Sequence, residues 1–383
     1  MLKEPTTKDH SVRVAPVSAV TGQPGPLTSA AVVATRNGGP ESLQVRAWEV
    51  PPPGPDEVRI RVEAAGISFA DLAICQDMHP ERYYPKRRRP PLVPGWDVVG
   101  VVESVGSRIR DVQVGQRVAA ITIVGGWAEH AVVPAARVVP VPPRLAPTTA
   151  VCLVLDYVTA YQMLTRSTSA QRGDTVLIQG AGGGCGTALL QLARHLGVRA
   201  IGTGREAKRA HIESQGGILI DYEHEDIAHR ARQLTAGRGV DYAYDGIGAT
   251  ARTSLRALRP GGRLVWFGMV TVLSGGARDW RGTAKMAGIL ALALLGNLRP
   301  GGKRTSLYSI QWLARRHPDW FRADLATLLA MLAANEIAPH IAAVRSLDEV
   351  PTALVALAGH APPGKQVIAV APTDSTSAAQ PSM

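Results

Sequence analysis

The stretch from Gly173 to Arg194, GDTVLIQGAGGGCGTALLQLAR, constrains the fold of this chain more than any other part of its sequence. A short apolar run leads into four glycines within five positions and then into a segment with the spacing of an amphipathic helix. Glycines let a backbone approach a pyrophosphate closely, and the start of a helix offers free N–H groups. A plain tight turn would show the same glycines. The position between strand and helix, with a second strand ending about 20 residues later, favours a dinucleotide site.

Strand-like and helix-like segments alternate from Cys152 onward. TVLIQG, RAIGTG, VDYAYDG and RLVWFG read as strands, and the alternation predicts a parallel sheet with crossover helices. Before Pro142, short β-rich segments separated by Pro, Gly and Asp turns predict a compact, mostly antiparallel domain. FRADLATLLAMLAANEI reads as an amphipathic helix and KQVIAVAP as a terminal strand that returns the chain to the first domain.

The 383 residues exceed what a single core usually holds, about 250–300 residues, so two domains are expected. We expect a disordered N-terminal extension at residues 1–27, followed by the first part of the mostly-β domain at 28–151. The dinucleotide-binding domain is expected at 152–308, a return to the first domain at 309–371, and a disordered tail at 372–383.

The formal net charge of +11 does not by itself predict a nucleic-acid partner, because the basic residues are mostly scattered among acidic ones. The one dense run, KRRR at 86–89, reads as a solvated loop, with a positive rim for an anionic ligand as the alternative. Cys75, Cys152 and Cys185 form no CxxC pair, which favours a reducing cytoplasm over a disulfide framework.

No apolar run reaches the roughly 18–20 residues of a membrane span, so no transmembrane segment is expected. The nearest approach is MAGILALALLGNL at 286–298. Three interpretations stay open for this segment: a wall of the substrate site that favours a large apolar substrate, a subunit contact, or an ordinary buried helix.

The glycine-rich stretch resembles the signature of the zinc-independent quinone oxidoreductase (zeta-crystallin-like) branch of the medium-chain dehydrogenase/reductase superfamily. AAGISFADLAI, PPLVPGWDVVGVVESVG, GGWAEHAVVP and LRPGGRLVWFG are similar to further motifs of that branch. The resemblance implies an α/β protein with a GroES-like mostly-β catalytic domain and a Rossmann domain with a doubly wound parallel sheet. It places the active site in the cleft between them. The matching positions of the signature are Gly173, Asp174, Leu177, Ala181, Gly182, Gly183, Gly184, Gly186, Gln191 and Arg194.

The end of the second predicted strand indicates which dinucleotide binds. Rossmann domains that select NAD usually end this strand with Asp or Glu, whereas this chain offers Thr203, Gly204, Arg205 and Lys208. Two cations would form charge-assisted hydrogen bonds to a 2′-phosphate, so NADPH is the predicted cofactor. The alternative is that Arg205 and Lys208 are solvated charges at the start of a helix, and the nearby Glu206 keeps this alternative open. We assign a further set to the cofactor site: Thr159, Ala181, Gly182, Gly183, Gly184, Cys185, Gly186, Gly246, Ile247, Phe267, Gly268 and Met269.

The resemblance also bears on zinc. Zinc-dependent alcohol dehydrogenases of this superfamily carry a Cys where this chain has Ser68 and a His-Glu pair where it has Trp96 and Asp97, and the third ligand region reads LVLDY. We therefore expect no metal. Without a Lewis acid to stabilise an alkoxide, the favoured substrates are quinones and α,β-unsaturated carbonyls, whose delocalised anions hydrogen bonds can stabilise.

Three residues are candidates for catalysis. Ser68 and Asp71 occupy the family's Asn-x-x-Asp pair beside the nicotinamide, with Ser in place of Asn. Tyr157 is a candidate proton donor or oxyanion partner, and packing against Tyr161 is the alternative.

The aromatic residues Tyr83, Tyr84 and Trp127 could sandwich a flat substrate, or they could be ordinary core or surface aromatics. The predicted function is NADPH-dependent reduction of an apolar or aromatic small molecule, a bulky polyketide-like one included, by a cytoplasmic homodimer. Two alternatives stay open: a cofactor-binding protein without turnover, as in vesicle-associated members of the family, and a redox-neutral cyclase or isomerase.

Overall fold

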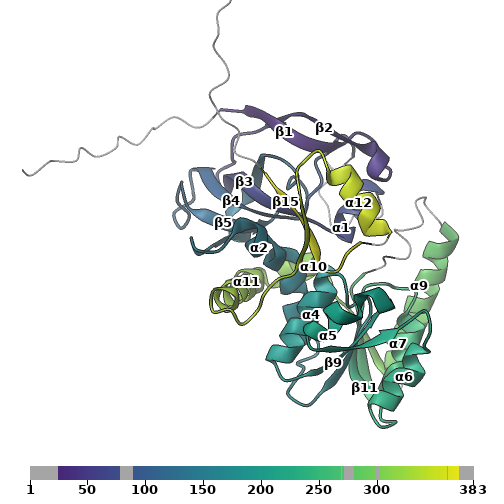
Figure 1. Ribbon diagram of the computed structural model, residues 1–383. Helices are drawn as coiled ribbons and strands as arrows, with labels where there is room; N and C mark the ends of the chain where they lie inside the picture. Colours follow the sequence, from purple (N-terminus) through teal and green to yellow (C-terminus); the bar gives the residue numbers. More distant parts are fainter. Residues whose placement is uncertain are drawn as a thin grey trace, which may run out of the picture.

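The computed structural model describes residues 25–77, 89–268, 270, 280–298, 302–359 and 361–370. The described chain forms a six-stranded sheet, a seven-stranded sheet and a two-stranded hairpin. Figure 1 shows the six-stranded sheet with its helices below and the seven-stranded sheet with the hairpin above. The helices between the two sheets come from the middle and the end of the chain.

The six-stranded sheet has the order β10-β9-β8-β11-β12-β13, and every neighbouring pair is parallel. This is the doubly wound order of a Rossmann domain, so the predicted fold class is confirmed. Its strands are β8 (Thr175–Ile178), β9 (Arg199–Gly204), β10 (Gly217–Asp221), β11 (Val240–Asp245), β12 (Leu258–Trp266) and β13 (Arg304–Leu307).

Helices cover both faces of this sheet, and β8 shows why. Val176 and Ile178 belong to the main core, whereas Leu177 belongs to a second core cluster that includes Ala228 and Ala251. Successive strand residues point to opposite faces, so a continuous apolar strand needs a cover on each side. The covering helices are α4 (Gly184–His195), α5 (Arg209–Ser214), α6 (Ile227–Leu234), α7 (Ala251–Ala257) and α9 (Trp280–Leu295), with the short η6 (Glu206–Lys208) and η7 (Gly296–Leu298).

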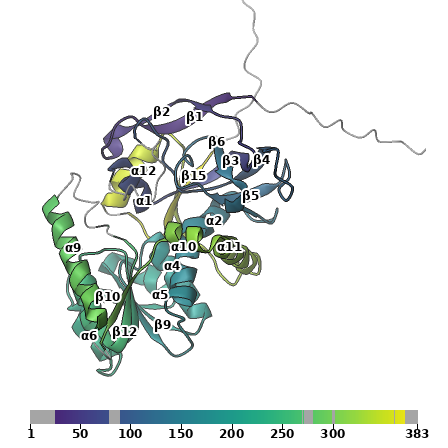
Figure 2. The ribbon, with the colours of Figure 1, turned by 180° about the vertical axis from the view of Figure 1, so that it is seen from behind.

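The seven-stranded sheet has the order β14-β15-β3-β4-β5-β7, with β6 also paired to β3. Figure 2 shows the β1–β2 hairpin lying over this sheet on the side away from the Rossmann domain. The elements of this region are β1 (Leu27–Ala34), η1 (Pro40–Ser42), β2 (Leu43–Val50), β3 (Glu57–Ile67), α1 (Phe69–Cys75), β4 (Asp97–Val105), β5 (Arg117–Ile121), β6 (His130–Pro134), η3 (Ala135–Arg137), β7 (Val138–Pro140), β14 (Ile341–Arg345), α12 (Val350–Ala358) and β15 (Lys365–Ala369).

Helical segments from two parts of the chain connect the sheets. The first group is continuous, leads into the Rossmann sheet and comprises α2 (Pro147–Cys152), η4 (Leu153–Tyr157), α3 (Val158–Gln162) and η5 (Met163–Ser167). The second group, α10 (Ile310–Arg316) and α11 (Pro318–Ala333), follows β13, and after it the chain returns to the seven-stranded sheet as β14 and β15. Within the described ranges, no helix has both the length and the apolar character needed to cross a membrane.

The strands at 217–221, 304–307 and 341–345 were missed by the sequence reading. Each has only four or five residues, and β13 carries Arg304 and Thr305, so neither length nor alternation marks it as a strand. Their pairing partners are distant in sequence or lie across a helix, which local periodicity does not record.

The segment 286–298 is neither fully buried nor fully exposed. Ile289 and Leu290 pack against the second core cluster. Leu294, Leu295 and Leu298 are 37%, 58% and 78% exposed. The buried-helix interpretation therefore holds for one side of α9 only.

We predict that Gly186→Ala lowers the free energy of unfolding by about 2 kcal/mol, the usual cost of overpacking. An added Cβ would lie 2.5 Å from the Gly180 carbonyl oxygen and 2.6 Å from the Ala181 Cα. Gly183→Ala is the matched control, because its nearest atom would be 3.6 Å away and its backbone is extended. Chemical denaturation measures both variants, and equal stabilities would contradict this account of the turn.

Candidate active site

The glycine-rich turn after β8 is held by side chains of the neighbouring strand. The Thr203 hydroxyl accepts a hydrogen bond from the Gly180 N–H at 3.1 Å and donates one to Gln179 Oε1 at 2.9 Å. Gly180 has a φ of +70°, a conformation that favours glycine. Gly183 is the N-cap residue of α4 and has no side chain that could bind the first N–H groups of the helix. Among the described residues, no N-cap side chain binds the first N–H groups of α4, at the place where the sequence predicts a dinucleotide pyrophosphate.

Two predicted cations lie beside this turn. The aliphatic part of Lys208 packs against Gly182, where an added Cβ would collide with the Lys208 Cδ. Burial lowers the pKa of Lys208, and the positive charge of Arg205 lowers it further. Among the described residues no carboxylate pairs with Lys208. An anion that contacted both cations would relieve their repulsion.

The sequence shows no Asp or Glu at the end of β9, but the fold brings a carboxylate to this position from another segment. Arg205 forms an ion pair with Glu223, with 2.8 Å between Nε and Oε1. Glu223 follows β10, a strand that the sequence reading missed, so its proximity to Arg205 was not visible. Glu206, which left the cofactor assignment open, is instead bound by Arg209 at 2.6 Å.

The ends of β11 and β12 form the next part of the site. An added Cβ on Gly246 would lie 2.8 Å from the Phe267 ring, and one on Gly268 would lie 2.7 Å from the Gly246 carbonyl oxygen. The Ile247 side chain lies against Gly180 of the glycine-rich turn. The structure therefore brings these four predicted residues to the carboxyl edge of the sheet. Met269 lies outside the described residues.

A buried ion cluster lies where the two sheets meet. The Lys365 ammonium is 3.0 Å from Asp97 Oδ2 and 3.5 Å from Asp156 Oδ2, and the three side chains are 2%, 0% and 13% exposed. Burial alone would lower the pKa of Lys365, but Asp156 and Asp97 raise it above its usual value. The adjacent Gly364 N–H donates to the Gly182 carbonyl at 3.1 Å. The cluster thus lies next to the glycine-rich turn.

Ser68 and Asp71 form a hydrogen-bonded pair at the start of α1. Asp71 Oδ2 accepts from the Ser68 N–H at 2.8 Å and from the Ser68 hydroxyl at 2.7 Å, and Oδ1 accepts from the Gly95 N–H at 3.1 Å. Asp71 is fully buried, whereas Ser68 is half-buried. Burial, and next the negative charge of Asp97, raise the pKa of Asp71 to about 7 despite the donors around it.

These residues do not fit a zinc ion. The Ser68 hydroxyl is bound to Asp71, and Asp97 is bound to Lys365, so the groups at the family's metal positions are already engaged. In the part of the chain that the structure describes, no three His, Cys, Asp or Glu side chains are grouped to hold a metal ion. The donor chemistry therefore supports no metal-assisted step.

The remaining predicted residues are mostly buried. Tyr157 is 2% exposed, and its hydroxyl donates to Gln191 Oε1 at 2.8 Å, which favours packing over proton transfer. Trp127 is completely buried, and its Nε1 donates to the Gly66 carbonyl at 2.9 Å. This argues against its assignment to the substrate, because the ring is part of the GroES-like core. Tyr83 and Tyr84 lie outside the described residues.

Thr159 and Cys185 lie near the same buried region. Thr159 is 8% exposed and hydrogen-bonds Tyr308, whose hydroxyl donates to Gln162 Oε1 at 2.8 Å. Burial raises the pKa of the Cys185 thiol well above its usual value, which favours a packed thiol over a nucleophile. Tyr308 follows β13 and was missed because that strand was missed.

The comparisons with known proteins agree with this architecture. Residues 54–143 match the alcohol dehydrogenase GroES-like domain, and residues 184–289 match the family model named zinc-binding dehydrogenase. A GroES-like domain joined to a Rossmann domain defines the medium-chain dehydrogenases/reductases, and the chain belongs to that superfamily.

Within the superfamily the chain belongs to the quinone oxidoreductase branch. It is 35% identical to a quinone oxidoreductase of Pseudomonas aeruginosa over 60% of this chain and 70% of that protein. It is 30% identical to the human synaptic vesicle membrane protein VAT-1 homolog over 82% of this chain and 78% of that protein. A mycobacterial protein solved in complex with NADPH superposes with a TM-score of 0.76 at 29% identity, covering 89% of this chain and 99% of that one.

We predict that Asp71 makes the stability of the protein depend on pH. Its pKa rises from an ordinary 3.8 to about 7 on folding, so between these values the folded state binds more protons than the unfolded state. Stability should therefore fall as the pH rises from about 4 to about 7. Asp71→Asn should make this fall shallower in denaturation curves measured across that range. An unchanged slope would contradict the buried, neutral carboxyl.

Proposed function

We propose that this oxidoreductase uses NADPH to reduce a quinone or an α,β-unsaturated carbonyl compound, without a metal. The observation that carries the proposal is the Ser68–Asp71 pair, a half-buried hydroxyl backed by a fully buried carboxyl with a pKa of about 7. Such a pair can supply a proton near neutral pH. A conjugated substrate suits it, because its anion is delocalised and needs a proton and hydrogen bonds rather than a Lewis acid.

The chain's own residues account for the cofactor preference. Lys208, which lies across Gly182, and Arg205 are placed to bind a 2′-phosphate. The N–H groups at the start of α4 are placed to bind the pyrophosphate. NADPH, when bound, supplies the hydride.

The proton follows a path through two side chains. As the substrate accepts a hydride, the Ser68 hydroxyl donates its proton to the resulting enolate or hydroquinone anion. In its protonated form Asp71 is the donor across the 2.7 Å separation from the Ser68 hydroxyl, so Ser68 recovers a proton from it. After the product leaves, the buried Asp71 carboxylate regains a proton through the half-buried Ser68 hydroxyl. One hydride and one proton complete the reduction of a C=C bond or a quinone.

We further propose that the protein works in the cytoplasm as a homodimer, on an apolar or aromatic substrate. Steady NADPH oxidation with a panel of quinones and enones tests the proposed function. Tight NADPH binding without oxidation would instead favour a binding protein, and substrate turnover without net oxidation would favour a cyclase or isomerase.

We predict that NADPH binds more tightly than NADH, and that Arg205→Ala with Lys208→Ala removes most of the difference, about tenfold or more, because charge-assisted hydrogen bonds are lost. Glu223→Gln should increase the preference, since Arg205 loses its competing partner at 2.8 Å. Fluorescence titration with both nucleotides measures the dissociation constants. Equal affinities in the unmodified protein would contradict the assignment of the 2′-phosphate site.

We predict that kcat/KM falls as the pH rises through about 7, because the reactive form of Asp71 is protonated. Ser68→Ala and Asp71→Asn should lower kcat about 100-fold and remove this pH dependence, while the NADPH dissociation constant stays nearly constant. Ser68→Thr keeps the hydroxyl and should retain most activity. A full pH dependence in Ser68→Ala would show that the proton comes from another group.

A further inference from the structure

In the part of the chain that the structure describes, one side of α9 (Trp280–Leu295) is an exposed apolar surface. Its inner residues Ile289 and Leu290 pack on the second core cluster. The described residues of its outer side recur at three- and four-residue intervals, which places them in one stripe along the helix. Small residues form the first part of the stripe, and leucines form its C-terminal end. Its exposed members are Ala284, Ala287, Gly288, Ala291, Leu294, Leu295 and Leu298.

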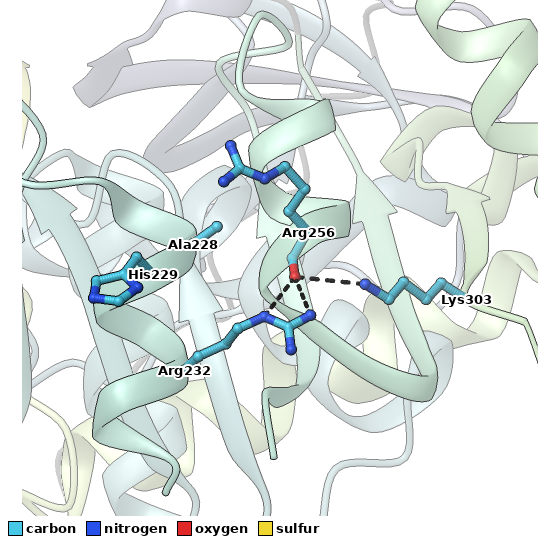
Figure 3. Close-up of a pocket in the computed structure, with 5 residues that line it drawn as sticks. All are labelled: Ala228, His229, Arg232, Arg256 and Lys303. Carbon is cyan, nitrogen blue, oxygen red and sulfur yellow. Dashed lines mark hydrogen bonds between the residues drawn. The ribbon is translucent and has the colours of Figure 1, made fainter. Parts of the chain in front are cut away.

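A basic pocket lies on the same side of the Rossmann domain. It has a volume of about 240 Å³ and is lined by Ala228, His229, Arg232, Arg256 and Lys303. Figure 3 shows the Arg232 guanidinium and the Lys303 ammonium converging on the main-chain carbonyl of Arg256. The lining contains no acidic residue, and the carboxylate of Asp226 lies 3.4 Å from Arg256 outside it.

The cations of this pocket keep free donors. Arg232 uses Nε and Nη2 for the Arg256 carbonyl, and within the described residues its Nη1 donates to no acceptor. Lys303 donates to the Leu255 carbonyl at 2.6 Å and to the Arg256 carbonyl at 3.5 Å. An ammonium has three donors, so one donor has no acceptor among the described residues. The cationic groups of Arg232 and Lys303 lie close together at the Arg256 carbonyl, whereas the Arg256 guanidinium points away from them. A phosphate oxygen could accept the donors that Arg232 and Lys303 keep.

The apolar stripe and the pocket adjoin each other. Lys303 is separated from Leu298 by four residues, and its carbonyl oxygen lies 3.8 Å from where a Cβ on Gly296 would stand. Asn297, between the exposed leucines, bonds the backbone of Thr305 at 2.8 Å and 2.6 Å. These bonds fix the leucines beside the cationic segment. Figure 1 shows α9 along the outer side of the domain next to α6 and α7, which carry the pocket residues other than Lys303.

We propose that this surface, formed by the stripe on α9 and the basic pocket, docks the protein on an anionic lipid bilayer. Leu294, Leu295 and Leu298 would enter the boundary between headgroups and acyl chains, and Arg232, Arg256 and Lys303 would bind lipid phosphates. Leucines beside a cluster of basic residues are the composition that binds an anionic membrane surface.

Charge favours the bilayer over a second copy of this chain. In a two-fold contact the same surface of the second copy would face this one. The stripe and the pocket lining carry no carboxylate, so the pocket cations would meet no opposite charge in such a contact. In an anionic bilayer the acyl chains would accommodate the leucines of the stripe, and the headgroup phosphates would neutralise the cations of the pocket.

The test is sedimentation of the full-length protein with vesicles. We expect binding to vesicles of phosphatidylcholine and phosphatidylserine in a two-to-one ratio and little binding to phosphatidylcholine alone, with binding weakened by salt. The double variant Leu295→Ser, Leu298→Ser and the variant Lys303→Gln should each lose about tenfold or more of this binding. Lys303→Arg should keep it.

Controls exclude general effects of polarity and charge. Val114→Ser is the control for the leucine variant, because Val114 is an apolar side chain that is 63% exposed in the GroES-like domain, away from the proposed surface. Arg110, which also donates to backbone carbonyls, at 2.8 Å, gives Arg110→Gln as the match for Lys303→Gln. Both controls should bind vesicles like the unmodified protein, and thermal unfolding verifies that each variant is folded.

Four outcomes would overturn the proposal. The first is equal binding to both kinds of vesicle, and the second is unchanged binding in the leucine variant. The third is a dimer that Leu298→Ser dissociates while no vesicle binding occurs, which would assign the surface to a second copy. The fourth is binding of inorganic phosphate without any vesicle binding, which would reduce the pocket to a site for free phosphate. None of these outcomes bears on NADPH turnover.

Discussion

The buried ammonium of Lys365 fixes the relative positions of the segments that form the site. Its partners Asp97 and Asp156 come from β4 and η4, and Lys365 itself begins β15. Removing ions from water costs several kcal/mol for each charge, so a buried cluster is stable only when its partners are all in place. Three segments that are far apart in the chain are therefore held together at one point.

The same cluster acts on both halves of the site. Next to Lys365, the Gly364 N–H binds the Gly182 carbonyl, so β15 holds the glycine-rich turn directly. On the other side, the charge of Asp97 adds to burial in raising the pKa of Asp71. A single ion cluster thus links the position of the predicted pyrophosphate site to the protonation state of the proposed proton donor.

What the sequence predicted correctly was local. The strands β8, β9, β11 and β12 are apolar and follow turn signals, so their periodicity sufficed, and the glycine-rich turn followed from its own spacing. The ion cluster was missed because Lys365 lies more than 200 residues from Asp156. Glu223 was missed for a different reason, because only the pairing of β9 with β10, a strand that the sequence did not predict, brings it to Arg205. Scattered basic residues likewise gave no sign that Arg232, Arg256 and Lys303 share a pocket.

The groups at the family's metal positions support the proposed preference for conjugated substrates. A divalent ion would have to displace the Lys365 ammonium from Asp97, and that ammonium is fixed by a second carboxylate and excluded from solvent. The fixed cation neutralises charge but offers no open coordination position to a substrate oxygen. In the proposed reaction, stabilisation of a developing anion then rests on hydrogen bonds and on a proton from the hydrogen-bonded Ser68–Asp71 pair. An alkoxide concentrates its charge on one oxygen and gains too little from such a pair, whereas an enolate or hydroquinone anion spreads its charge and needs less.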